Sequence, residues 1–208
     1  MYLPGERVVA SDAPDWAKDK RKAVPYNWYE EAFLNLLYGV EGDGANRDGL
    51  KETPKRAAKA WIEKTDGYGR DPSELFKTFE SDGYDEMVVV RDIEWASTCE
   101  HHLVPFFGHA HVAYIAQGRI IGLSKIPRLV DLYAHRLQTQ ERITMQVADA
   151  LEKYLEPAGV AVVLQARHMC MECRGVKKSA TTMTSVTRGA MRDKAAARGE
   201  FLRLIGVQ

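Results

Sequence analysis

The order of the apolar segments after residue 86 constrains the fold most strongly. Four segments rich in β-branched and aromatic residues predict strands, at 87–95, 107–116 (continued by 119–122), 159–169 and 179–187. Between the second and third of these strands, apolar residues recur at helical spacing in two segments, about 125–137 and 141–155. The resulting β-β-α-α-β-β order favours an α+β chain with a four-stranded, largely antiparallel sheet and helices on one face.

The second of these helices has the clearest pattern in the chain. One stripe collects its apolar residues, namely Ile143, Val147, Ala150, Leu151, Tyr154 and Leu155. Pro157 is expected to end the helix, because proline cannot continue one. Residues 189–204 predict a further helix at the C-terminus.

The N-terminal third is expected to be helical. Residues 27–40 carry apolar side chains at helical spacing, and the glycine-rich residues 41–49 interrupt them. A second helix should start with Thr53 as N-cap and Pro54 at the first helical position, and a shorter one at Asp71-Pro72. We therefore expect an arm at 1–26, a helical region at 27–84 and a catalytic domain at 85–208.

Charge and hydropathy exclude several classes of protein. Lys and Arg number 29 and Asp and Glu also number 29, so the formal net charge is zero. This balance argues against a nucleic-acid-binding chain and favours self-association. Because the sequence lacks a run of about 18 apolar residues and its first 22 residues lack an apolar core, neither a membrane span nor a secretory signal is expected. We expect a cytoplasmic protein.

Two segments rich in cysteine and histidine predict a metal site. They are residues 99–102 (CEHH) and 168–174 (HMCMECR). Three cysteines are an odd number for a disulfide framework, and thiolate with imidazole suits zinc. Cys99 and His102 can face one ion if a turn ends the strand, and Cys170 or Cys173 is then the source of a third ligand.

The sequence leaves two kinds of metal site open. Two cysteines and one histidine would leave a position for water, which is typical of catalytic zinc, whereas all three cysteines with His102 would close a structural site. Alternatively, Cys173 is a buried apolar residue. His101 and His168 lie beside the ligands and are available for proton transfer. His109 and His111 share one side of a strand, where satisfied strand or interface histidines are expected rather than a metal pair.

Two basic clusters predict an anion site. Ser124, Lys125 and Arg128 stand at the start of a helix, and residues 174–178 (RGVKK) follow the metal segment. Together they could hold a triphosphate, although each cluster alone is expected to be a solvated surface. Glu141 opens the next helix, where complementing the helix dipole is favoured over binding a guanine edge.

These segments together resemble the GTP cyclohydrolase I family. The motifs that carry the resemblance run in order over about residues 30–205, at 53–56 (TPKR), 97–102 (STCEHH), 112–114 (VAY), 122–125 (GLSK), 140–142 (QER), 168–170 (HMC) and 174–175 (RG). The resemblance implies the tunnelling fold, in which subunits join edge to edge into pentameric rings paired as a decamer. It also implies active sites at the subunit interfaces.

The resemblance further implies a role for each site residue. Zn²⁺ would be bound by Cys99, His102 and Cys170, without Cys173. His168 would handle the proton at purine N7, and His101 with Ser124 would assist opening of the ribose. The remaining residues would bind the substrate. Glu141 and Gln140 would bind the guanine edge, and the triphosphate would be bound by Lys125, Arg128 and Arg174. Arg56 of a neighbouring subunit would also bind the triphosphate.

The implied reaction is zinc-dependent hydrolysis of GTP at C8, with release of formate and rearrangement to 7,8-dihydroneopterin triphosphate. Two alternatives remain at this stage. One is a zinc nucleotide hydrolase of the same fold that stops at the formamide. The other is a non-catalytic nucleotide-binding module stabilised by zinc.

Overall fold

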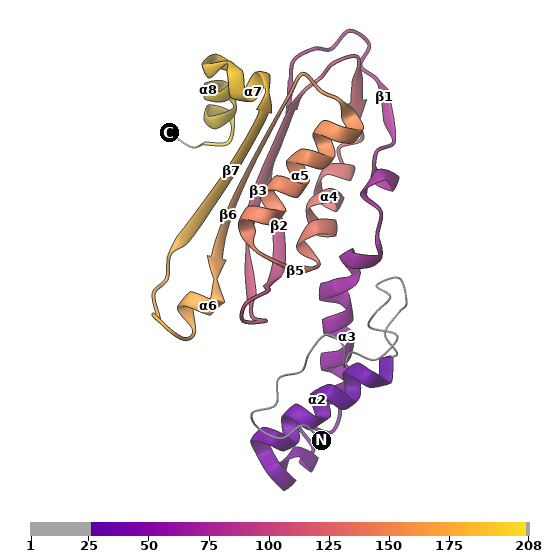
Figure 1. Ribbon diagram of the computed structural model, residues 1–208, viewed down its shortest axis with the longest axis vertical. Coiled ribbons are helices and arrows are strands. Elements are labelled where there is room, and N and C mark those ends of the chain that lie inside the picture. Colours follow the sequence, from indigo (N-terminus) through magenta and orange to yellow (C-terminus); the bar gives the residue numbers. More distant parts are fainter. Residues whose placement is uncertain (1–25, 207–208) are drawn as a thin grey trace, which may run out of the picture. The chain divides into compact units, whose positions relative to one another are not determined.

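A computed structural model of the chain describes residues 26–206 (Figure 1). The chain divides into two compact units between Glu63 and Lys64. This division groups residues 64–84 with the second unit, whereas the sequence pattern favours grouping them with the N-terminal helices. The arm expected at 1–26 lies outside the described residues, apart from Tyr26. Within residues 26–206, no helix is both long enough and apolar enough to cross a membrane.

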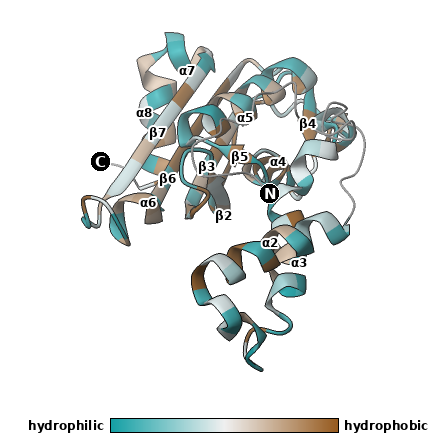
Figure 2. Cartoon of the chain, turned by 60° about the horizontal axis from the view of Figure 1, so that its bottom comes forward, coloured by the Kyte–Doolittle hydropathy of each residue, from teal (hydrophilic) through white to brown (hydrophobic). Residues whose placement is uncertain are grey.

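Two helices and a 3-10 turn form the described part of the N-terminal unit. They are α2 (Tyr26–Glu41), η2 (Gly42–Asn46) and α3 (Thr53–Thr65). Phe33 packs edge-on against Trp61, with 6.3 Å between the ring centroids. None of the described residues of α2 is buried, and its hydrophobic segments are visible in Figure 2. Thr53 is the first helical residue rather than the N-cap, because the amide of Arg56 already donates to the carbonyl of Glu52.

The second unit is built on a five-stranded sheet. Its strands lie in the order β5-β2-β3-β6-β7, with bounds Leu137–Gln138, Met87–Cys99, Pro105–Ile115, Gly159–His168 and Thr181–Gly189. The four longer strands are antiparallel neighbours, as predicted. The fifth strand, β5, pairs in parallel with Thr98 and Cys99. Its two residues are too few to produce an alternating pattern, so the sequence does not predict this strand.

A second, two-stranded sheet corrects another expectation. Residues 119–122 were expected to continue the second strand, but Gly118 has a φ of +74° and the chain turns there. Strand β4 (Arg119–Ile121) pairs instead with β1 (Thr78–Glu80). The short helical turns η3 (Asp66–Gly69) and η4 (Pro72–Leu75) precede β1, and the Asp71 side chain caps η4 by accepting from the Ser73 amide at 2.9 Å.

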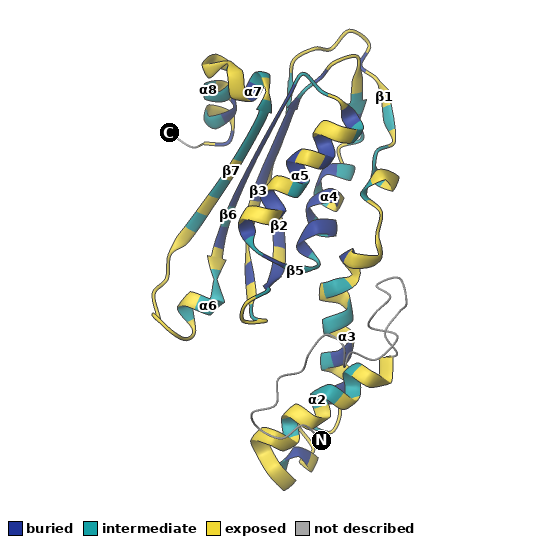
Figure 3. Ribbon diagram, in the orientation of Figure 1, coloured by how far each residue is buried: buried dark blue, intermediate teal, exposed yellow. Residues whose placement is uncertain are grey.

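Helices α4 (Lys125–Ala134) and α5 (Gln140–Leu155) cover one face of the large sheet. The predicted stripe of α5 is its buried face: Ile143, Val147 and Leu151 are fully buried against the sheet. The helix starts one residue earlier than expected, at Gln140, because Thr139 caps it by accepting from the Arg142 amide at 3.3 Å. Figure 3 shows the resulting core between these helices and strands β3 and β6.

The C-terminal helices pack on the opposite face, so the expectation of helices on one face is incomplete. Ala113 and Ala161 alternate with the core residues of their strands and contact Met191 and Phe201 in a second, smaller cluster. The single helix expected at 189–204 is two, α7 (Ala190–Asp193) and α8 (Ala195–Leu204), separated by the extended residue Lys194.

The topology gathers several chain segments at one end of the large sheet, which we call the turn end. The β2–β3 turn at residues 99–104, strand β5, the first turn of α5 and the one-turn helix α6 (Met169–Glu172) all lie there (Figure 1). Phe106 of β3 pairs in register with His168, the last residue of β6. The cysteine- and histidine-rich segments therefore meet.

Candidate metal centre and active site

A tight turn places Cys99 and His102 side by side. The Cys99 amide donates to the Val104 carbonyl at 2.9 Å, and the Leu103 amide donates to the Cys99 carbonyl at 2.8 Å. Leu103 takes a φ of +57° to close the turn. The Sγ atom of Cys99, a residue only 7% exposed, lies 3.7 Å from Nδ1 of His102. The strand thus ends in the turn that the three-residue spacing of these ligands requires.

The third donor comes from α6. Sγ of Cys170 joins Sγ of Cys99 and a ring nitrogen of His102, and all three atoms lie within 4.8 Å of one another. Cys173, at the end of α6, does not belong to this group. It is exposed, and its thiol donates to the Met169 carbonyl at 2.9 Å. The alternative that made Cys173 a buried apolar residue is therefore wrong.

The donor set fits a zinc ion. Ligand atoms around tetrahedral zinc stand roughly 3.5–3.8 Å apart, which matches the distance from Cys99 to His102. Burial raises the pKa of the Cys170 thiol, and the nearby Cys99 thiol raises it further. Two adjacent thiolates would repel each other, and a divalent cation between them would remove that repulsion.

Two further histidines border the donor group. Nδ1 of His101 lies 4.0 Å from Sγ of Cys99, on a largely exposed side chain. His168 stacks on Phe106, with ring centroids 4.8 Å apart and planes inclined by 15°. Burial lowers the pKa of His168, whereas the carboxylates of Glu141 and Glu172 act in the opposite direction.

The first turn of α5 places Gln140 and Glu141 in different surroundings. Glu141 is exposed at the helix start, near enough to His168 for its charge to act on that ring. Gln140 is only 1% exposed. Its amide nitrogen donates to the carbonyls of Leu164 and Thr182, and its amide oxygen lies 2.8 Å from Nε2 of His168.

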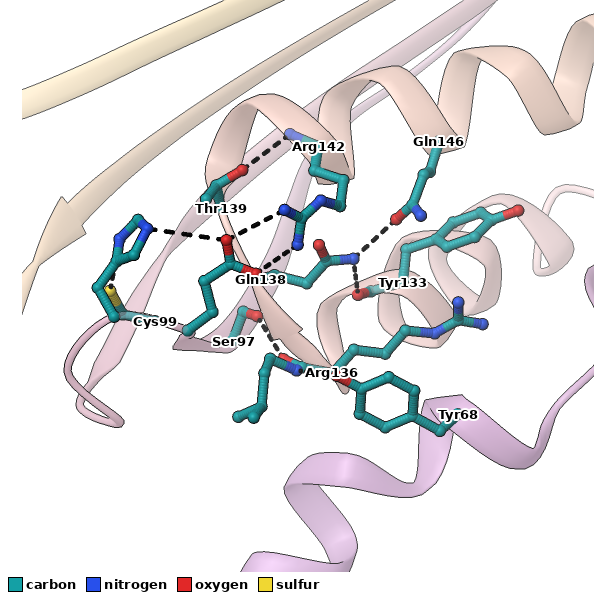
Figure 4. A network of polar contacts seen from close by, with 12 residues as sticks. Tyr68, Ser97, Cys99, Tyr133, Arg136, Gln138, Thr139, Arg142 and Gln146 are labelled. Carbon is teal, nitrogen blue, oxygen red and sulfur yellow. Dashed lines mark hydrogen bonds and ion pairs between the residues drawn. The ribbon is translucent and has the colours of Figure 1, made fainter. Parts of the chain in front are cut away.

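An ion pair that the sequence analysis missed joins α5 to the turn. The guanidinium of Arg142 meets the carboxylate of Glu100, with Nη2 and Oε1 3.0 Å apart. Figure 4 shows Arg142 beside Thr139 and Gln138, its side chain extending toward the segment that follows Cys99. The hydrogen bond from Arg142 lowers the pKa of Glu100. Both residues belong to motifs noted in the sequence, but their 42-residue separation gives no signal of contact.

The expected triphosphate ligands do not all lie at the turn end. Arg174 does, since its Nη1 is 3.4 Å from the Cys170 carbonyl. Ser124, Lys125 and Arg128 stand at the start of α4, whereas the end of that helix contacts β2 through the bond from Ser97 Oγ to the Ala134 carbonyl. A ten-residue helix, about 15 Å long, therefore separates them from the donor group.

Arg56 lies exposed on α3, in the N-terminal unit. One chain thus brings together eight of the expected residues, namely Cys99, His101, His102, Gln140, Glu141, His168, Cys170 and Arg174. The GTP cyclohydrolase I family model matches residues 29–206. The chain belongs to the GTP cyclohydrolase I family.

Individual relatives agree with the GTP cyclohydrolase I assignment. GTP cyclohydrolase 1 of Chlorobaculum tepidum is 53% identical over 178 residues, which cover 85% of this chain and 79% of the relative. The Thermobifida fusca protein is 52% identical over 179 residues, covering 85% and 86%. The protein of Janthinobacterium sp. (strain Marseille) is 51% identical over 185 residues, covering 88% and 93%.

Membership of the GTP cyclohydrolase I family confirms several predictions. The chain is an enzyme of this hydrolase class, with GTP cyclohydrolase activity and GTP as its substrate. The antiparallel sheet with its helices is the tunnelling fold of the family. The group formed by Cys99, His102 and Cys170 could bind a metal ion, as expected of a metalloenzyme family.

Proposed function

We propose that the chain catalyses zinc-dependent hydrolysis of GTP at C8, with release of formate and rearrangement to 7,8-dihydroneopterin triphosphate. The observation that carries the proposal is the convergence of Cys99, His102 and Cys170 at the turn end, with two histidines beside them. Three protein ligands would leave a fourth position on zinc, and a bound zinc would supply Lewis-acid activation of water.

The two histidines supply proton transfer. His168 handles the proton at purine N7, because a ring nitrogen that leaves during hydrolysis must be protonated. Its ring, held against Phe106, supports this role since its position is restricted. His101, on the exposed side of the donor group, assists opening of the ribose together with Ser124.

Glu141 binds the guanine edge in this proposal. Its exposed carboxylate can accept two N–H groups, those of N1 and the exocyclic amine, in a bidentate arrangement. The resemblance assigns Gln140 to the same edge, but its amide nitrogen already donates to two backbone carbonyls and its oxygen contacts His168. The proposal therefore leaves the guanine edge to Glu141.

A neighbouring subunit completes the triphosphate site. Arg174 lies beside the donor group, whereas Ser124, Lys125 and Arg128 lie a helix length away, so copies of these residues from another chain are required. Arg56 is assigned to a neighbour in the same way. In the assembly we propose, two pentamers form a decamer with active sites at subunit interfaces.

The sheet supports such an assembly. In the described part of the chain, β7 pairs only with β6, and β2 pairs on its outer side only at Thr98 and Cys99. Open strand edges of this length are usually paired or covered.

Native mass spectrometry would give the subunit number. Mixing inactive Lys125→Ala and Cys170→Ala chains should restore part of the activity if two chains share one site. We place the enzyme in the cytoplasm, where thiols stay reduced.

The test of the reaction is to incubate the purified protein with zinc and GTP. We expect one formate per GTP consumed and, after oxidation, a fluorescent pterin. GTP consumption without formate would favour the hydrolase that stops at the formamide. Absence of turnover, with four protein donors seen by metal-edge spectroscopy, would favour the non-catalytic module.

A further inference from the structure

We propose that Gln140 is a positioning residue that fixes the tautomer and the orientation of His168, and that it does not contact the guanine base. The inference rests on the proposed function for the role of His168 in proton transfer. It assigns Gln140 a role different from that of its exposed neighbour Glu141.

The hydrogen bonds of Gln140 determine which way its amide points. Nε2 lies 2.9 Å from the Leu164 carbonyl and 3.1 Å from the Thr182 carbonyl. A backbone carbonyl can only accept, so the group between these two oxygens must be the NH₂, with one hydrogen for each. The reversed amide would place three acceptors together. Oε1 therefore faces Nε2 of His168, at 2.8 Å.

The orientation of this amide determines the tautomer of His168. Oε1 of Gln140 can only accept, so Nε2 of His168 must carry the hydrogen in their bond. In the neutral imidazole, the lone pair is then on Nδ1, which becomes the atom that exchanges a proton. Stacking on Phe106 restricts the plane of the same ring. The contact with Gln140 thus selects which ring nitrogen carries the hydrogen, and the contact with Phe106 fixes the plane of the ring.

Gln140 is itself held from several sides. The backbone carbonyl of Gln140 accepts from the hydroxyl of Thr144 at 2.7 Å, and that hydroxyl lies 2.7 Å from the hydroxyl of Thr184 on β7. The two carbonyls that accept from its side chain belong to β6 and β7. Turning the amide toward a nucleotide would break both of these hydrogen bonds at a buried side chain, which is unfavourable.

The kinetic test compares Gln140→Met with Glu141→Gln. Methionine keeps the length of the side chain and removes both the donors and the acceptor. We expect Gln140→Met to lower kcat about a hundredfold, the typical contribution of a positioned acid or base, with an unchanged ratio of kcat/KM for GTP over ITP. ITP lacks the exocyclic amine, so Glu141→Gln should lower that ratio. A lowered ratio with unchanged kcat in Gln140→Met would overturn the proposal.

A spectroscopic test does not depend on turnover, and its decisive spectrum is that of the wild-type protein. Solid-state ¹⁵N spectra of the wild-type holoenzyme, labelled at histidine and assigned with His168→Gln, distinguish the protonated from the unprotonated ring nitrogen. We expect the hydrogen of His168 on Nε2, and a mixture of tautomers in Gln140→Met. A wild-type hydrogen on Nδ1 would overturn the proposal even if GTP is hydrolysed as proposed. Absence of formate release would instead overturn the proposed function alone.

Discussion

Arg142 and Glu100 form a bidentate ion pair that joins the first turn of α5 to the turn carrying Cys99 and His102. The amide of Glu100 also donates to the Gln138 carbonyl at 3.1 Å, so the turn is held at its backbone as well. Gln140, two residues before Arg142, contacts the other ligand-bearing segment through His168. A single helical turn therefore contacts both segments that supply metal ligands.

Breaking this ion pair should weaken metal binding. Arg142→Met removes the guanidinium that binds the Glu100 carboxylate, and the turn bearing two of the three donors loses this attachment to α5. We expect about a tenfold loss of zinc affinity, at the lower end of the effect of residues that orient metal ligands. Competition with a chromogenic chelator measures it.

Asp149→Asn is the matched control for Arg142→Met. It removes an ion pair with Arg188, 2.9 Å long, on the same helix but away from the metal ligands. Zinc affinity should be unchanged in this variant. Equal zinc affinities for wild type, Arg142→Met and Asp149→Asn would show that the Glu100 ion pair does not orient the donors.

Cys170 and Cys173 should differ in their effect on zinc content. Cys170 belongs to the donor group, whereas the thiol of Cys173, three residues further along the chain, donates to the Met169 carbonyl. We expect Cys170→Ser to lose bound zinc and hydrolytic activity, and Cys173→Ser to retain both. Zinc per subunit by elemental analysis checks this. Loss of zinc from Cys173→Ser would place that thiol in the metal site.

Gly108 should tolerate no side chain. A Cβ at this position of β3 would lie 1.9 Å from the Gln165 carbonyl oxygen and 2.8 Å from Cα of Ala166, both backbone atoms of β6. The strands would have to separate, so we expect Gly108→Ala to lower the free energy of unfolding by about 3 kcal/mol.

Gly39 provides the comparison for Gly108. It lies within α2, and nothing stands within 4 Å of the Cβ it would acquire. Gly39→Ala should therefore be neutral or stabilising by up to about 1 kcal/mol, because alanine favours the helix. Urea denaturation of both variants tests the pair. A Gly108→Ala protein as stable as wild type would contradict the close packing of β3 on β6.

Periodicity predicted the parts of the fold that are long enough to show it. The four longer strands and the stripe of α5 bury continuous apolar faces, so their patterns survive in the sequence. Strand β5 has two residues and depends on contact with Thr98 and Cys99. The break at Lys194 and the packing of α8 on the second face depend on tertiary contacts that local sequence does not encode.

The candidate site also has parts that the sequence predicts and parts that it does not. The donor residues Cys99, His102 and Cys170 could be proposed from residue chemistry and from motifs, because metal ligands are few in kind. The hydrogen bonds of Gln140 could not, since its partners are backbone carbonyls of Leu164 and Thr182, and any residue type provides a carbonyl. A hydrogen bond to a backbone atom places no requirement on the residue type of the partner, so the sequence carries no sign of it.

His111 should make the stability of the fold depend on pH. Its side chain is 5% exposed, and its Nδ1 accepts from the amide of Asp92 at 3.2 Å, where Asp92 takes a φ of +57° in the bulge of β2. Burial lowers the pKa of His111. The charges of His109 and Arg91 lower it further, and the Asp92 carboxylate acts against them.

The sign of the effect follows from this lowered pKa. Between the ordinary histidine pKa, about 6.5, and the lower value in the folded protein, the unfolded chain binds a proton that folded His111 does not. Stability must therefore fall as the pH drops through this window and level off below it. In His111→Gln the fall should be smaller. Other groups, including the metal ligands and His168, are unchanged and cancel in the comparison.

Urea denaturation at several pH values between 5 and 7.5 measures this difference between His111→Gln and wild type. His109→Gln is the control, because it removes a neighbouring histidine from the same side of the strand but keeps the burial of His111, the largest cause of its lowered pKa. Its fall in stability should therefore stay close to that of wild type. Parallel pH profiles for wild type and His111→Gln would mean that the bulge opens to protonate His111 at no cost. The hydrogen bond from the Asp92 amide to Nδ1 would then contribute little to holding the bulge.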